Sequence, residues 1–134
     1  MNIKVIRKVL VVLLIFMFLL PGASFARLSE SERLEKLVKM INKNQSKNLK
    51  TFEKKAKDYF FGVQKPETIE TLIKEFPPGD TVAIIIMSNL SKKSYRDIAN
   101  MRKSDKGWQD MANQLGVELK NVIKEVISFR SGIG

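Results

Sequence analysis

The stretch DTVAIIIMSNL, residues 80–90, decides the fold class of this chain. Val82 and residues 84–86 have a high strand propensity. A strand needs a partner, however, and no other segment after residue 27 has a strand pattern, so a lone strand would leave its backbone groups unpaired. Asp80 can cap a helix, and a helix that is apolar on every side suits the centre of a bundle. The stretch therefore predicts a buried central helix.

The preceding segment, KPETIETLIKEFPPG (residues 65–79), predicts a short amphipathic helix. Pro66 suits the first turn, where its missing N–H has no helical partner to lose. Apolar residues then recur at the i, i+3, i+4, i+7 spacing of one helix face. This face consists of Ile69, Leu72, Ile73 and Phe76. Pro77, Pro78 and Gly79 end the helix.

Residues 28–61 contain two apolar stripes at helical spacing. The stripes are Leu34, Leu37, Val38 and Ile41, then Phe52, Ala56, Tyr59 and Phe60. Between them lies NKNQSKN, residues 42–48, which has no apolar residue. It is either an exposed turn of one helix or a joint between two. We predict one long helix, kinked at this point and ended by Gly62.

The C-terminal third predicts three short helices. Ser94 and Asp97 have the spacing of a capping box, and residues 104–107 (SDKG) form a turn. Gly116 suits the left-handed position that ends a helix. The apolar faces of the three helices are Ile98 and Met101; Trp108, Met111, Ala112 and Leu115; and Leu119, Val122, Ile123 and Val126. Residues 130–134 predict a frayed end. The fold class expected is all-α, a small bundle of five to seven helices.

The last corner, GWQDMANQLGVELKNVIKEV (residues 107–126), has the spacing of a helix-turn-helix. Ala112 allows a close approach of two helices, Gly116 supplies a positive φ, and Val122 closes the corner. These properties suit a purely structural corner as well as a DNA-reading one. The second helix presents Glu118, Lys120, Asn121, Lys124 and Glu125, and its two acids oppose contact with phosphate. Nucleic acid is therefore a disfavoured partner, and DNA binding is the alternative function.

The N-terminus has the three-part layout of a secretory signal peptide. Three basic residues precede an uncharged apolar run over residues 9–20, and small residues at 24 and 26 offer a cleavage site after Ala26. We expect residues 1–26 to be removed and residues 27–134 to form one helical domain, periplasmic or secreted. An uncleaved anchor would leave the same topology, because positive charge before the apolar run stays in the cytoplasm. Contact with a membrane is expected only through this segment.

Composition excludes several kinds of chemistry. The chain has no histidine and no cysteine, which removes the usual general base, thiol nucleophile and transition-metal ligands. We therefore expect no metal, no cofactor and no enzymatic activity. Residues 27–134 hold 21 basic and 14 acidic residues, a net charge of +7. This surplus favours an anionic envelope component or an acidic protein as partner, although a solvated lysine-rich surface is the preferred explanation, because acids are interspersed with the lysines.

The C-terminal motif resembles that of small exported bacterial helical proteins of unknown function. The resemblance is carried by Gly107, Trp108, Met111, Ala112, Leu115, Gly116 and Val117. It spans roughly residues 82–117 and implies a helical fold and an envelope location. It implies no activity.

Three groups of residues are candidates for contact with a partner. Trp108 can stack on a ligand, although its apolar stripe favours a place in the core. Tyr59 and Phe61 belong to a run of three aromatics that cannot all face inward on one helix. The third group is a basic cluster of Lys92, Lys93, Arg96, Arg102, Lys103 and Lys106, which can hold phosphate or carboxylate groups.

Asp97, Asp105 and Asp110 are the only carboxylates near Trp108 in the sequence. Paired acids can cleave glycosidic bonds, so an Asp-dependent carbohydrate-active enzyme is a further alternative. It is the less favoured one, because no base, nucleophile and orienting group converge in the sequence. The preferred function is a non-enzymatic binding or interaction module in the bacterial envelope or outside the cell.

Export makes a direct prediction. Protein recovered from cell fractions should lie outside the cytoplasm and begin at Arg27, with the mass of residues 27–134. Intact-mass measurement and N-terminal sequencing of each fraction test this. A full-length chain dissolved in the cytosol would contradict export and would favour the DNA-binding alternative with a misread N-terminus.

Overall fold

A computed structural model describes residues 28–133, and this range contains seven α-helices and no strand. The helices are α2 (Glu30–Gln45), α3 (Leu49–Tyr59), α4 (Pro66–Glu75), α5 (Pro78–Ser91), α6 (Tyr95–Lys103), α7 (Trp108–Leu115) and α8 (Leu119–Ile133). The predicted all-α fold is confirmed. The predicted signal segment lies outside the described residues.

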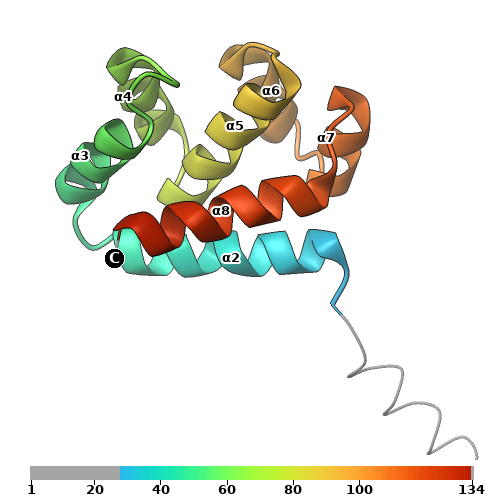
Figure 1. Cartoon of the computed structure of the whole chain (residues 1–134), viewed down its shortest axis with the longest axis horizontal. Helices are drawn as coiled ribbons and strands as arrows, with labels where there is room; N and C mark the ends of the chain where they lie inside the picture. Colours follow the sequence, from blue (N-terminus) through green and yellow to red (C-terminus); the bar gives the residue numbers. More distant parts are fainter. Residues whose placement is uncertain (1–27, 134) are drawn as a thin grey trace, which may run out of the picture.

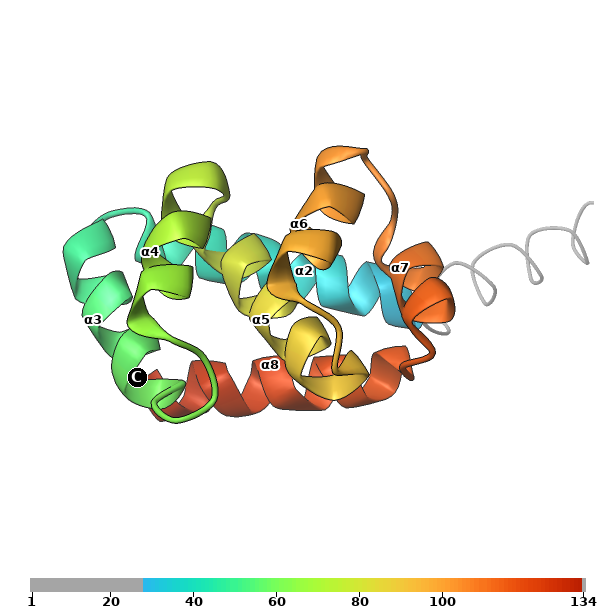
Figure 2. The ribbon, with the colours of Figure 1, turned by 90° about the horizontal axis from the view of Figure 1, so that it is seen from above.

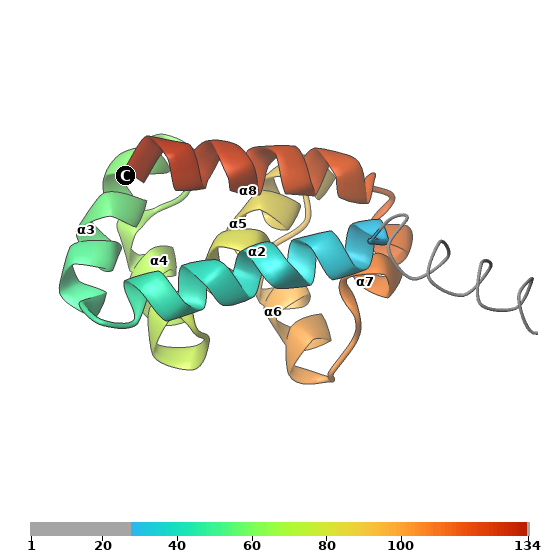
Figure 3. The ribbon, with the colours of Figure 1, turned by 90° about the horizontal axis from the view of Figure 1, so that it is seen from below.

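The helices form two layers (Figure 1). α2 and α8 lie side by side and run in the same direction, as the view from below shows (Figure 3). α5 lies across this pair at the centre, with α3 and α4 at one end and α6 and α7 at the other (Figure 2). Buried side chains from all seven helices make one hydrophobic core, in which α5 contacts α2, α6 and α8 most extensively.

α5 confirms that residues 80–90 form a buried helix. Every residue from 78 to 88 is buried, and Val82, Ile84 and Ile85 are completely inaccessible to solvent. The helix begins earlier than its sequence indicated. Pro77 in extended conformation is the N-cap and Pro78 is the first helical residue, so the prediction that Asp80 caps the helix is wrong. The fixed φ of Pro78 suits this first position, and it places Asp80 in the first turn.

The N-terminus of α5 is capped by another helix. Neither Pro77 nor any other residue of α5 provides a side-chain cap. The Gly79 N–H instead donates to Oδ1 of Asn42 on α2, at 2.6 Å. This contact is possible because Gly79 has no side chain: a Cβ there would meet the Val38 carbonyl oxygen and would lie 2.8 Å from Asn42 Oδ1. The two backbones therefore approach closely where the buried helix begins.

The predicted single long helix over residues 28–61 is wrong, because α2 and α3 are separate. α2 ends at Gln45 and α3 begins at Leu49, and Asn48 between them adopts a non-helical conformation (φ −148°, ψ 88°). Oδ1 of Asn48 accepts from the Thr51 N–H at 3.1 Å and caps α3. The polar run is thus a joint, in which the Asn48 side chain takes the place of one helical hydrogen bond that the break removes. α3 ends at Tyr59, before the turn that contains Gly62 (φ 79°).

The predicted frayed end is also wrong, because α8 continues to Ile133. Phe129 is completely buried and contacts the rings of Phe52, Tyr59 and Phe60 at centroid distances of 5.0–6.2 Å. Tyr59 also lies directly against the backbone of Gly132, where a Cβ would be 2.8 Å from the ring. This aromatic packing holds the last turn of α8 in place.

At the corner between α7 and α8, Gly116 adopts the left-handed conformation that the sequence predicts. Gly116 has a φ of 69°, and the Val117 N–H donates to the Ala112 carbonyl at 3.0 Å. This pattern is the Schellman motif that commonly ends helices. Ser94 likewise caps α6, since its hydroxyl accepts from the Asp97 N–H at 3.2 Å. The left-handed Gly116 and the Ser94 cap are confirmed, whereas the described residues show no return hydrogen bond from the Ser94 N–H to the Asp97 side chain that would complete a capping box.

The close approach at Gly79 predicts that alanine at this position destabilises the protein more than alanine at a glycine with free space around it. Gly79→Ala should lower the free energy of unfolding by about 2 kcal/mol or more, because the new Cβ must push α5 away from α2. Gly107→Ala is the matched control. Nothing lies within 4 Å of a Cβ at Gly107, so this change should cost less than about 1 kcal/mol, arising only from alanine at the N-cap of α7. Urea unfolding of both variants measures the difference, and equal losses would contradict the close contact.

Candidate functional site

Three of the six members of the predicted basic cluster are paired with carboxylates from other helices: Arg96, Arg102 and Lys103. Glu75 at the end of α4 contacts two of its members on α6: Arg96 at 3.2 Å and Lys103 at 3.1 Å. The hydrogen bond from Lys103, assisted by Arg96, lowers the pKa of Glu75 below its usual value. The same pairing with Glu75 is the main reason that the pKa of Arg96 is raised.

Arg102 is the most deeply engaged member of the cluster. Its guanidinium lies over the Trp108 ring, 4.0 Å from the ring centroid, and contacts Asp80 at 3.4 Å and Glu35 at 3.7 Å. It also donates to the carbonyl of Lys106 at 3.1 Å. Arg102 therefore joins α2, α5, α6 and the start of α7. This is a structural role, in which stacking and ion pairing act together.

Trp108 is a core residue. It is 1% exposed, and its indole N–H donates to Glu35 Oε2 at 2.6 Å. The core interpretation of its apolar stripe is confirmed, and the ring presents no free surface to a partner.

The remaining members of the cluster have no ion pair among the described residues; Lys92 and Lys93 are exposed and Lys106 is half-buried. Lys106 donates to Gln114 at 2.8 Å. Lys92 ends α5 in a left-handed conformation (φ 62°). Among the described residues, the side chains of Lys92 and Lys93 form neither an ion pair nor a hydrogen bond. The six residues thus form no common pocket of free positive charge.

The two aromatic candidates, Tyr59 and Phe61, differ in their exposure to solvent. Phe61, in the turn after α3, is 86% exposed, whereas Phe60 is buried. Tyr59 is 38% exposed and packs against Phe60, Phe129 and Gly132. Of the predicted pair, Phe61 alone is almost entirely in solvent.

The three aspartates of the enzymatic alternative occupy helix starts and a turn. Asp97 lies in the first turn of α6, Asp110 lies in the first turn of α7, and Asp105 is a turn residue with a φ of 58°. All three are exposed. Within residues 28–133, no three His, Cys, Asp or Glu side chains lie close enough together to hold a metal ion.

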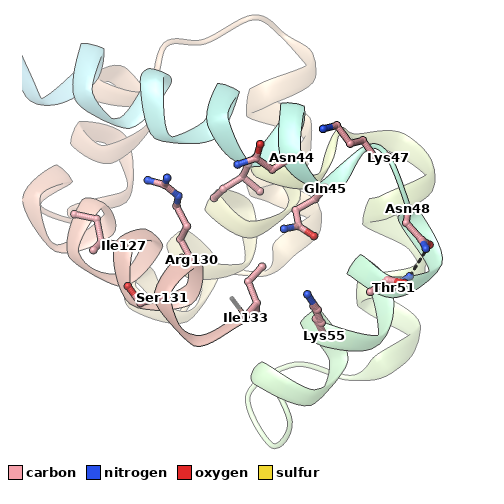
Figure 4. A pocket seen from close by; sticks show the side chains of 11 residues that line it. Asn44, Gln45, Lys47, Asn48, Thr51, Lys55, Ile127, Arg130, Ser131 and Ile133 are labelled. Atoms are coloured by element: carbon pink, nitrogen blue, oxygen red, sulfur yellow. Dashed lines mark hydrogen bonds between the residues drawn. The ribbon is translucent and has the colours of Figure 1, made fainter.

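A cleft of about 670 Å³ opens at the other end of the molecule, where α2 ends, α3 begins and α8 ends (Figure 4). Its size falls within the range of about 300–1,000 Å³ that is usual for ligand sites. We call it the α2–α3–α8 cleft. Its position follows from the fold: α2 and α8 run in the same direction and end together, and α3 turns away at the Asn48 joint.

Three cations line this cleft, one from each part of its wall. Arg130 extends from α8 toward α2, Lys55 extends from α3 toward Gln45, and Lys47 lies in the α2–α3 joint (Figure 4). No Asp or Glu is among the described residues that line the cleft. Within residues 28–133, the side chains of these three cations have no ion pair. The cleft therefore concentrates positive charge that no carboxylate of the described chain offsets.

The rest of the wall combines neutral polar side chains with a small apolar surface. The polar members are Asn44, Gln45, Asn48, Thr51 and Ser131, and the apolar members are Ile41, Ile127 and Ile133. Asn48 is engaged as the cap of α3, whereas the amides of Asn44 and Gln45 form no hydrogen bond within the described residues. Amide groups can both donate and accept hydrogen bonds. The wall thus offers charge, amide groups and apolar contact together.

Sequence reasoning missed this cleft. Lys47 belongs to the polar run predicted to be an exposed turn of one helix, and Arg130 belongs to the predicted frayed end. Lys55 lies on the polar side of a helix for which the sequence predicts only a buried apolar stripe. The one available indication was the density of asparagine, glutamine and lysine over residues 42–48.

A scan against protein-family models, a search of curated proteins and a search of solved structures each found no match to this chain. Among residues 28–133, no helix has both the length and the apolar composition needed to cross a membrane.

The Arg102 contacts predict a pH-dependent loss of stability. Burial raises the pKa of Asp80 above its usual value, and Arg102 opposes that rise. Arg102→Gln should therefore raise this pKa further and leave an uncompensated charge at neutral pH, which costs about 2–3 kcal/mol of unfolding free energy. Because the folded-state pKa is the raised one, the loss appears as pH rises through it and shrinks when acid protonates Asp80.

Unfolding of wild type and Arg102→Gln at neutral and acidic pH measures this effect. Lys103→Gln is the matched control on the same helix, because its pair with Glu75 is solvent-exposed and should contribute less than about 1 kcal/mol. A loss for Arg102→Gln that is the same at every pH would contradict the assignment to Asp80.

Proposed function

We propose that this chain is an exported, non-enzymatic binding protein whose partner is an anionic molecule held in the α2–α3–α8 cleft. One observation carries the proposal: Lys47, Lys55 and Arg130 line a cleft of ligand size, and no carboxylate is among its described lining residues. Such a wall attracts negative charge and holds it by charge-assisted hydrogen bonds.

The N-terminal layout supports a place outside the cytoplasm. A positive start, an uncharged apolar run and small residues before Arg27 agree with one another. The resemblance to small exported helical proteins points in the same direction. An anionic envelope component is then the kind of partner that the chain would encounter there.

The composition supports binding without catalysis. Histidine and cysteine are absent from the sequence, and the described residues of the cleft wall present lysine, arginine, amide and hydroxyl groups but no carboxylate to act as a base. The three aspartates of the enzymatic alternative lie elsewhere, apart from this wall.

The corner of α7 and α8 favours a second candidate function, DNA binding through α8. Its support is the tight turn at Gly116, which joins the two helices at the spacing of a helix-turn-helix. Against it stands the exposed face of α8. Glu118 at its start forms an ion pair with Lys120 at 3.1 Å, and Glu125 adds a second acid. These acids oppose phosphate contact, so the cleft is the stronger candidate.

Binding to heparin, a soluble polyanion, tests the proposed function. The variant K47Q/K55Q/R130Q should bind at least about tenfold more weakly than wild type, because it removes the cations of the cleft. The control variant R33Q/K74Q/K93Q removes the same charge from exposed positions outside the cleft and should lose less than about threefold. Wild-type affinity should also fall steeply between about 0.05 M and 0.5 M salt.

Two results would overturn the proposal. Equal losses in both triple variants would mean that overall charge, without a site, governs binding. An affinity that does not change with salt would mean that charge has no part in it.

A further inference from the structure

The arrangement of groups in the α2–α3–α8 cleft indicates the class of anion that it takes. The three cations are spread along the wall: Arg130 and Lys55 extend from facing helices, and Lys47 lies at the joint (Figure 4). A single small ion is held best by cations that converge on one point. Separated cations suit a ligand that carries several separated negative charges.

The neutral groups lie between the cations. Asn44 and Gln45 occupy the last turn of α2, between Arg130 and Lys55 in Figure 4, and their amides are not used elsewhere in the described residues. A side-chain amide offers both donors and an acceptor, which matches the hydroxyl group of a polyol or sugar. In a ligand whose negative charges are separated by hydroxyl-bearing units, the charges would face the cations while the hydroxyls face the amides between them.

The apolar part of the wall is small. Of the eleven described residues that line it, eight have polar side chains and three are isoleucines. Three isoleucines provide contact for the C–H faces of a sugar or polyol but are too few to enclose an acyl chain. No aromatic residue is among the described residues that line the cleft, so these residues offer no stacking platform for nucleic-acid bases.

We propose that the cleft binds a linear anionic glycan or polyol chain, in which negative groups repeat between hydroxyl-bearing units. The inference rests on the proposed function and names the ligand class of the same site. Lys47, Lys55 and Arg130 contact the negative groups, and Asn44 and Gln45 contact the hydroxyls between them. Carboxylate and phosphodiester polymers share this chemistry.

Four labelled polymers of equal charge test the ligand class by fluorescence anisotropy. Polygalacturonate and poly(glycerol phosphate) carry hydroxyls between their charges, whereas polyglutamate carries none and single-stranded DNA carries bases. Wild-type protein should bind at least one of the first two about tenfold more tightly than either of the others. The tighter of the first two identifies the charged group as carboxylate or phosphodiester.

The variant Asn44→Ala/Gln45→Ala tests the assigned contacts. It should weaken binding of the preferred hydroxyl-bearing polymer by about tenfold, because two hydrogen bonds to hydroxyls are lost. Binding to polyglutamate should change less than about twofold, because the three cations remain. If polyglutamate binding also falls, a folding defect is distinguished by the single variant Asn44→Ala, since Asn44 is exposed and makes no side-chain hydrogen bond within residues 28–133. Asn44→Ala alone should then weaken the preferred polymer selectively, by about threefold.

The results separate this inference from the proposed function. Equal binding of polyglutamate or DNA overturns the glycan assignment and leaves an anion-binding cleft. An unchanged preference in both amide variants also overturns it. Failure of all four polymers to bind overturns the proposed function itself.

Discussion

The complete burial of α5 is the constraint on which the rest of the structure depends. A helix buried along its length must be covered on every side, and its first N–H groups must find partners other than water. The covering is provided mainly by α2, α6 and α8, and the partner is Asn42 of α2, which accepts from Gly79. Because Asn42 can reach Gly79 only where the two backbones nearly touch, this one hydrogen bond also fixes the position of α2 against α5. α8 then packs beside α2, and the ends of both helices define the cleft.

Most of the fold could be predicted from periodicity, because apolar spacing reports which face of a helix is buried. The stripes of α4, α6, α7 and α8 all lie inward, and caps such as Ser94 and Gly116 are local in sequence. The helix break near residue 46 was not predictable in the same way. The run over residues 42–48 has no proline or glycine, and its first asparagine is drawn inward by a helix that begins more than thirty residues later. The continuation of α8 depends likewise on Tyr59, which is distant in sequence but packs against Gly132.

The candidate site shows a stricter limit of sequence reasoning. Six basic residues close in sequence suggested a cluster, yet the carboxylates that neutralise Arg96, Arg102 and Lys103 come from α2, α4 and α5. The opposite holds at the cleft, where Lys47 and Arg130 lie 83 positions apart in sequence and line the same cleft only because α2 and α8 end together. Charge density along a chain therefore says little about free charge on its surface. What decides is whether the fold places a carboxylate within reach.

The cations of the cleft also lie near helix ends, and compensation of helix dipoles is a competing explanation for their position. α2 and α8 both present C-termini to the cleft, and cations near C-termini stabilise helices. Each such end has the effect of roughly half a negative charge, and the N-terminus of α3 adds roughly half a positive one. The backbone at the cleft therefore offsets about half of one elementary charge. Three full positive charges from Lys47, Lys55 and Arg130 exceed this several-fold, so the helix dipoles leave most of the cleft's positive charge without compensation.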